Sequence, residues 1–234
     1  MDQIKIKIGD RSLSVDFYKA VTETKKIAIL LPGLPYKPKK YNLVDKLNDL
    51  GFDVAFLRYS GTWGSEGEFL EQPPQKDVNI LIKKIRDEGL NSILYKEVCL
   101  IGSSFGGAVS LTVNDDPIIK KIIVLSPVIS YKKVPAIDTL SEYLISNFPN
   151  EYVFRQERFT DLINDNISSP VNQYEIDSSK VLLIGGREDE EINISDIVEF
   201  GNQNNIRHIV FDGGHITFSK ITDDIFVIIK DFLN

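Results

Sequence analysis

A serine framed by two glycines is the residue of this sequence best suited to covalent chemistry. Residues 98–101 form an apolar run, residues 102–106 read Gly-Ser-Ser-Phe-Gly, and a second apolar run follows. This order predicts a buried strand that turns sharply into a helix, with Ser104 at the apex in a strained backbone conformation. The outer glycines remove side chains that would collide where strand and helix meet. Ser103 is the weaker candidate, because Ile101 rather than a glycine stands two residues before it.

The residue after this serine would help to stabilise negative charge. Phe105 opens the expected helix, so its backbone N–H and the positive end of the helix dipole can hold a developing oxyanion. The same short pattern also occurs in ordinary glycine-rich turns. A catalytic serine therefore needs a base, an orienting acid and a second oxyanion donor elsewhere in the chain.

The chain offers two histidines as a base. His208 lies inside an apolar run, residues 206–211, and is expected to be structural. His215 follows the same run behind two glycines, which leave room for an imidazole to approach a serine. His215 is therefore the predicted base.

An acid is available after another apolar run, residues 181–184. Asp189 follows it in a Gly-x-x-Asp turn, with the apolar Ile192 three residues further on. Its rivals are the neighbouring glutamates at positions 188, 190 and 191, which could equally form a plain acidic surface loop.

The remaining pattern predicts the scaffold for these residues. Apolar runs that indicate strands alternate with segments of helical spacing, which favours a mostly parallel sheet with helices on both faces. Ligands of such sheets bind at the carboxyl ends of the strands. An N-terminal antiparallel hairpin is expected from the alternating residues 4–8 and 13–18. The other expected strands are 27–31, 52–57, 98–101, 118–125, 181–184 and 206–211, and the expected helices are 41–50, 77–85, 105–113, 194–200 and 218–233.

One segment breaks the alternation. Residues 127–177 contain no clear strand, two expected helices at 137–146 and 151–164, and seven aromatic side chains. The segment is too long for a plain loop of a compact domain. We expect a small helical cap here, inserted into a core formed by residues 1–126 and 178–234. The aromatics could also simply attach the two helices to that core.

Composition limits the classes of function. The 234 residues are 42% hydrophobic and 26% charged, with a net charge of −7, which suits one folded α/β domain and disfavours nucleic acid or an anionic membrane as partner. The sole cysteine, Cys99, lies in an apolar run, as a small core residue would. No signal peptide, membrane-spanning run or cluster of metal ligands is visible, so a cytoplasmic protein without metal or cofactor is expected. Whether it is a monomer or a homodimer stays open.

Taken together, the candidate residues resemble those of the α/β-hydrolase superfamily, from residue 27 to the C-terminus. Its members carry nucleophile, acid and base in the order seen here in Ser104, Asp189 and His215, each at a matching strand end. The resemblance implies that Asp189, rather than a neighbouring glutamate, is the acid. It also implies that the backbone N–H groups of Leu34 and Phe105 form the oxyanion hole, and that neither metal nor cofactor is needed.

Two loops depart from the superfamily pattern. The loop after residues 27–31 reads Pro-Gly-Leu where His-Gly is usual, although a backbone donor at Leu34 can still serve. The loop 59–67 resembles Phe-Arg-Gly-x-Gly-x-Ser-x-Gly, but Ser60 replaces the arginine and Trp63 replaces a glycine. We expect Trp63 and Tyr131 to line the substrate pocket, with packing beneath the cap as the alternative for Trp63.

These features predict a serine hydrolase that cleaves a small carboxylic ester, thioester or amide through an acyl-enzyme. An acyltransferase or a serine aminopeptidase could use the same three residues. A non-catalytic binding protein on a degenerate hydrolase fold is the remaining alternative.

Overall fold

One mixed sheet of eight strands runs through the molecule. The computed structural model describes residues 1–234, and its strand order is β1-β2-β4-β3-β5-β6-β7-β8. The pairs β1–β2 and β2–β4 are antiparallel, and every other neighbouring pair is parallel, as predicted. The strands are β1 (Asp2–Ile8), β2 (Arg11–Tyr18), β3 (Lys26–Leu31), β4 (Asp53–Arg58), β5 (Glu97–Ser103), β6 (Ile119–Leu125), β7 (Val181–Gly186) and β8 (Arg207–Phe211).

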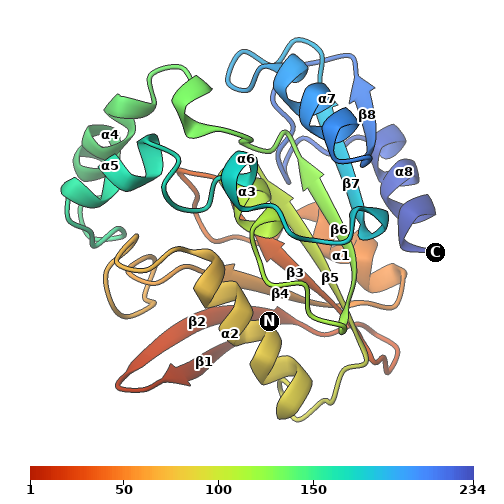
Figure 1. Cartoon of the computed structure of the whole chain (residues 1–234). Helices are drawn as coiled ribbons and strands as arrows, with labels where there is room; N and C mark the ends of the chain where they lie inside the picture. The colour runs from red at the N-terminus through yellow and green to blue at the C-terminus, as the bar shows by residue number, and fades with distance from the viewer.

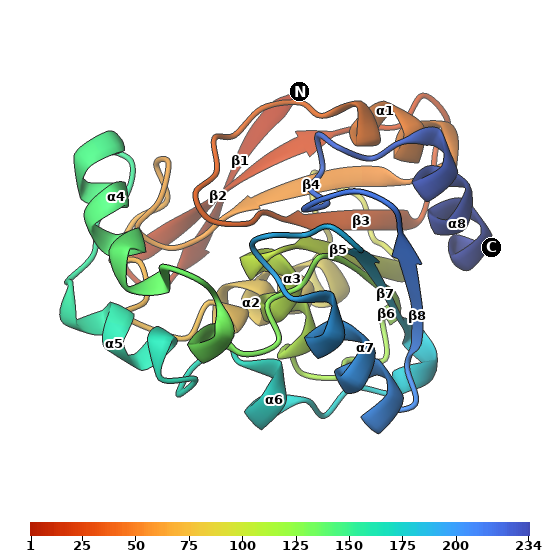
Figure 2. The ribbon, with the colours of Figure 1, turned by 90° about the horizontal axis from the view of Figure 1, so that it is seen from above.

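Helices cover both faces of the sheet. Figure 2 shows α1 (Asn42–Asp49) and α8 (Asp223–Leu233) on one face, and α2 (Gln75–Asp87), α3 (Phe105–Leu111) and α7 (Ile194–Gln203) on the other. Because neither face meets water, β7 is buried along its whole length and β3 from its second residue onward. No helix of the structure combines the length and the apolar character that crossing a membrane requires.

The segment between β6 and β7 contains no strand. It holds the short 3-10 helices Tyr131–Lys133 and Ile137–Thr139, then α4 (Leu140–Asn147), α5 (Glu157–Ile163) and α6 (Pro170–Gln173). Both views show α4 and α5 close together and well away from α7 and α8 (Figures 1 and 2). We call residues 127–177 the insertion.

The prediction of a helix over 151–164 was wrong in its first half, because α5 begins only at Glu157. Residues 151–153 are extended and pair with the loop after β4. The Trp63 N–H donates to the Glu151 carbonyl at 2.9 Å, and the Val153 N–H donates to the Gly61 carbonyl at 2.7 Å. These hydrogen bonds satisfy backbone N–H and C=O groups of both segments. If residues 151–153 formed a helical turn instead, the backbone groups of the loop would lose these partners.

The last helix also begins later than predicted, at Asp223 rather than residue 218. The hydroxyl of Thr222 accepts the N–H of Ile225 and so caps the helix. Phe218 instead packs its ring against Tyr41 from the loop before α1, with 5.5 Å between ring centres. The packing of Phe218 against Tyr41 therefore keeps residues 218–222 outside the helix, although the apolar spacing had predicted them to be part of it.

Candidate active site

Ser104 stands at the sharp turn between β5, which ends at Ser103, and α3, which begins at Phe105. Its backbone angles are φ 54° and ψ −118°, a conformation that costs a non-glycine residue about 1–3 kcal/mol. Three backbone hydrogen bonds hold it there. The Ser104 N–H donates to the Leu125 carbonyl at 2.9 Å, and its carbonyl accepts the N–H groups of Ala108 and Val128 at 3.1 and 3.2 Å.

The two glycines of the motif are needed for close backbone approach. A Cβ on Gly102 would collide with the carbonyl of Gly106 on the first turn of α3. A Cβ on Gly106 would collide with the carbonyl of Leu31, at the end of β3. The second glycine therefore brings α3 against β3, which also carries the Pro32-Gly33-Leu34 loop to the serine.

His215 and Asp189 form a directly bonded pair. The His215 Nδ1 lies 2.8 Å from Asp189 Oδ2, and both side chains are almost completely buried. The other carboxylate oxygen of Asp189 accepts the N–H groups of Glu191 and Ile192 at 3.0 and 2.9 Å. This turn places the aspartate, and not its exposed glutamate neighbours, against Nδ1 of the imidazole.

Opposing effects set the protonation of Asp189. Burial by itself raises the pKa of the carboxyl, but hydrogen bonds from His215, the Ile192 N–H and the Ser126 hydroxyl outweigh it and lower the pKa below its ordinary value. Asp189 is therefore ionised at neutral pH and can stabilise a protonated imidazole beside it.

Ser126 is a residue that the sequence argument missed. It is completely buried at the end of β6 with φ 41°, and its hydroxyl accepts the N–H of Ile216 at 3.0 Å. The hydroxyl thus connects the carboxylate of Asp189 with the backbone that carries His215. A Ser-Pro pair directly after an apolar run was the only signal for it in the sequence.

Ser104 and His215 line the same cavity of about 390 Å³, together with Gly33 and Leu34. We call it the His215 cavity. The Nε2 atom of His215 lies 3.7 Å from a carboxylate oxygen of the exposed Glu191, which also lines the cavity. The predicted base and the predicted nucleophile therefore border one accessible space.

Two backbone donors flank the serine. The N–H of Leu34 has no acceptor within the protein, and the N–H of Phe105 is the first of α3 and has no partner within that helix. The loop of Leu34 passes directly by the serine, since a Cβ on Gly33 would lie 3.1 Å from the Ser104 Cβ. Free donors beside a serine oxygen are the components of an oxyanion hole.

A second cavity of about 310 Å³ opens on the other side of Ser104. Its walls are mainly apolar side chains of the insertion, so we call it the insertion cavity. Tyr131 lines it, and its buried hydroxyl has no hydrogen-bond partner. Burial raises the pKa of Tyr131 well above its ordinary value, so the hydroxyl stays neutral.

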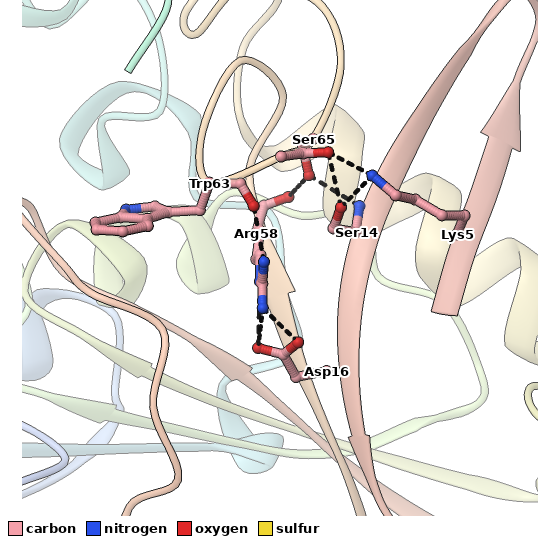
Figure 3. Close-up of polar contacts among 7 residues, drawn as sticks. Lys5, Ser14, Asp16, Arg58, Trp63 and Ser65 are labelled. Carbon is pink, nitrogen blue, oxygen red and sulfur yellow. Dashed lines mark hydrogen bonds and ion pairs between the residues drawn. The ribbon is translucent and has the colours of Figure 1, made fainter. Parts of the chain in front are cut away.

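Trp63 lines neither cavity. Its ring packs against Tyr36, Phe148 and Tyr152, with 6.1 to 6.4 Å between ring centres. Figure 3 shows the indole pointing away from the polar contacts that fix its backbone. Trp63 therefore belongs to the contact between the loop after β4 and the insertion, and it does not border the space around Ser104.

A buried ion pair holds the loop of Trp63 in place (Figure 3). Arg58, the last residue of β4, binds Asp16 of β2 through two of its nitrogens and donates to the Trp63 carbonyl at 2.8 Å. The Ser65 hydroxyl accepts the Ser14 N–H at 2.8 Å and donates to the Arg58 carbonyl at 2.7 Å. The loop is therefore tied to both strands beneath it.

The His, Cys, Asp and Glu side chains nowhere gather in a group of three or more that could hold a metal ion.

Solved structures with the same fold include enzymes. An esterase from Pyrococcus furiosus has a TM-score of 0.74 and 21% identity, covering 99% of this chain and 89% of that one. Est1E from Butyrivibrio proteoclasticus, solved with ferulic acid bound, has a TM-score of 0.73 and 18% identity, covering 98% and 97%. An α/β serine hydrolase homologue from Coxiella burnetii has a TM-score of 0.60 and 16% identity, covering 99% and 95%. At these identities the comparison establishes the α/β-hydrolase fold.

A search among curated proteins gave no match. Residues 67–234 match the family described as Uncharacterised protein family (UPF0227). The matched part contains Ser104, Asp189 and His215, whereas Leu34 and Trp63 precede it. Because the match extends over well more than half of the sequence, the chain belongs to the UPF0227 family.

Proposed function

We propose that this protein is a serine hydrolase that cleaves a small carboxylic ester, thioester or amide. One observation carries the proposal: a bonded His215–Asp189 pair opens onto the same cavity as a serine held in a strained turn. Backbone strain is maintained only where the surrounding structure enforces it, and such strain concentrates at functional sites.

In the proposed reaction the Ser104 oxygen attacks the substrate carbonyl while Nε2 of His215 takes its proton. Asp189 keeps Nδ1 protonated and stabilises the imidazolium. The N–H groups of Leu34 and Phe105 hold the oxyanion, each worth about 3–4 kcal/mol in comparable sites. His215 then protonates the leaving group, and a water molecule releases the acid from the acyl-enzyme by the reverse sequence.

The insertion serves this reaction as a cap. It follows β6 and lines the apolar cavity beside Ser104 with side chains such as Tyr131 and Leu140. An apolar cavity at the nucleophile would hold the acyl group and exclude water from it. The chain then divides into a core of residues 1–126 and 178–234 and a cap of residues 127–177.

A transferase that passes the acyl group to another molecule is the second candidate. The His215 cavity supports it, because this space reaches the imidazole and could hold an alcohol or amine in place of water. Product analysis with and without added acceptor alcohols would distinguish acyl transfer from hydrolysis.

A matched pair of serine variants tests the proposed function. We expect Ser104→Ala to abolish both labelling by a fluorophosphonate probe and turnover of a panel of 4-nitrophenyl esters, whereas Ser103→Ala keeps both. Ser103 is the proper control because it is adjacent, buried and lines the same cavity. Ester turnover by the Ser104→Ala protein at the parental rate would rule out the serine mechanism.

A further inference from the structure

The two cavities that meet at Ser104 differ in the residues that line them. They share Leu34, Pro35, Ser104 and Glu191, so a substrate bound at the serine can extend into both. The insertion cavity is lined largely by hydrophobic residues. The His215 cavity is lined largely by polar ones, among them three lysines: Lys37, Lys39 and Lys220.

The geometry decides which end of a substrate enters which cavity. In acyl transfer the base that activates the serine also protonates the leaving group, so the leaving atom must lie beside the imidazole. His215 lines the cavity with the lysines and does not line the insertion cavity. The leaving group therefore occupies the lysine side, and the acyl group occupies the insertion side.

The leaving-group side carries positive side chains, whereas the protein as a whole has a negative net charge. The chain has 34 acidic and 27 basic residues, yet none of these three lysines forms an ion pair. The neighbouring Lys40 and Lys46, in contrast, pair with Asp45 and Asp223. Glu191 contributes one carboxylate to this cavity, and the Lys39 ammonium lies over the Tyr41 ring at 5.1 Å. Three ammonium groups against one carboxylate still favour an anion there through Coulomb attraction.

The acyl side carries the opposite bias. Glu190 and Glu191 line the insertion cavity, where the remaining wall is mostly apolar and holds no lysine or arginine. A negative charge on the acyl group would meet carboxylates without a compensating cation.

We propose that the preferred substrate joins an uncharged, apolar acyl group to an anionic leaving group, an alcohol or thiol that bears a phosphate, carboxylate or sulfate. This inference rests on the proposed hydrolase function and adds the direction in which the substrate binds. Lys37, Lys39 and Lys220 select the leaving group by charge, while the insertion selects the acyl group by size and polarity.

Three esters of matched size test the direction. The first joins hexanoate to 4-hydroxybenzenesulfonate, the second joins hexanoate to the neutral 4-hydroxybenzenesulfonamide, and the third joins the mono-anion of adipate to the sulfonamide phenol. We expect kcat/KM for the first to exceed that for the second by about tenfold at low salt, with the third the poorest, since a few exposed charge pairs contribute on this scale. The advantage should decline as sodium chloride is added.

A triple variant, with Lys37, Lys39 and Lys220 each changed to Gln, should bring the ratio of the first two esters close to one. The matched control changes Lys19, Lys25 and Lys96 to Gln, which are also exposed and unpaired but lie next to the amino ends of β3, β4 and β5, away from Ser104. It should keep the ratio. An equal rate for the first two esters in the unsubstituted protein, or an unchanged ratio in the cavity variant, would overturn the proposal.

Binding separates this inference from the proposed function. If no ester is turned over in a Ser104-dependent way, the hydrolase proposal fails, and calorimetry with the Ser104→Ala protein still tests the cavity. The sulfonate phenol should then bind more tightly than the sulfonamide phenol, and the lysine triple variant should lose the difference. Equal binding of the two would refute the anion preference. Competition by inorganic phosphate against acetate would show which anion the lysines favour.

Discussion

The two sides of Ser104 are built by different parts of the chain. The side that holds His215 comes mainly from turns that follow the strands β3, β5, β7 and β8. The acyl side comes mainly from the insertion, whose short helices line a cavity with apolar side chains. The strand ends therefore supply the groups of the proposed reaction, and the insertion supplies the shape of the cavity that would hold the acyl group. Changes on the first side should affect rates, and changes on the second should affect which substrate is accepted.

The largest effect is expected at the base and the acid. His215→Ala and Asp189→Asn should each lower kcat for a 4-nitrophenyl ester by about 10⁴-fold, because the imidazole is lost or loses the partner that sets its tautomer. Glu188→Gln should leave the rate close to that of the parent. If Glu188→Gln or Glu190→Gln were the damaging change instead, the acid would have been assigned to the wrong residue.

Trp63 lies at the contact between the loop after β4 and the insertion, outside both cavities, and is expected to affect stability rather than selectivity. Trp63→Ala should lower the free energy of unfolding by about 3 kcal/mol, because it leaves a gap among Tyr36, Phe148 and Tyr152. The relative rates with short and long acyl esters should not change. Urea denaturation and ester kinetics on the same protein decide the matter, and an altered chain-length profile would place Trp63 in the pocket after all.

The pH dependence of stability should show a contribution from Asp77, which lies on α2 beside the loop after β4 and lines neither cavity. Burial raises the pKa of Asp77 to about 6, although hydrogen bonds from the Ser60 N–H and hydroxyl favour the ionised form. The folded state therefore keeps this proton more tightly than the unfolded chain does. Its stabilising contribution is complete below about pH 4 and is lost as the pH rises through about 6.

Asp77→Asn should remove this contribution. Between pH 4 and pH 7, the free energy of unfolding of the parent should fall by about 3 kcal/mol relative to that of the variant. Denaturation by urea at a series of pH values measures it. A difference that stays constant with pH would show that Asp77 has an ordinary pKa in the folded state.

The smallest effect is expected inside the insertion cavity. Leu140→Trp places a larger side chain in its wall and should change the kcat/KM ratio between short and long acyl esters by about tenfold in favour of short ones. Ile145→Trp is the matched control, since it lies on the same helix but is half exposed and lines neither cavity. Equal shifts in both variants would point to a general disturbance of α4.

Most of the core could be predicted because its signals are local. The first two strands were predicted from alternating residues and the other six from apolar runs. The strained turn at Ser104 was predicted from two glycines, whose missing side chains make room for carbonyl groups. The choice of Asp189 as the partner of His215 rested on the resemblance to the α/β-hydrolase superfamily, and the two side chains are in contact. Whether these residues catalyse remains a prediction.

The insertion could be predicted only in outline, because its structure depends on partners distant in sequence. Residues 151–153 had the composition of a helix start, yet they pair with the loop 61–63, almost ninety residues earlier. Ser126 was missed for a related reason. A single hydroxyl acquires its role only when β7 and β8 bring Asp189 and Ile216 to it.

The pairing between residues 61–63 and 151–153 affects how the insertion cavity would bind a ligand. The insertion is fastened to the core at its two chain ends and, through backbone hydrogen bonds and the Arg155–Glu68 ion pair, at its outer end as well. A segment fixed at three points loses its conformational freedom when the protein folds, not when a ligand arrives. The walls of the insertion cavity are therefore preorganised, and little of the free energy of binding an acyl group is spent on ordering them.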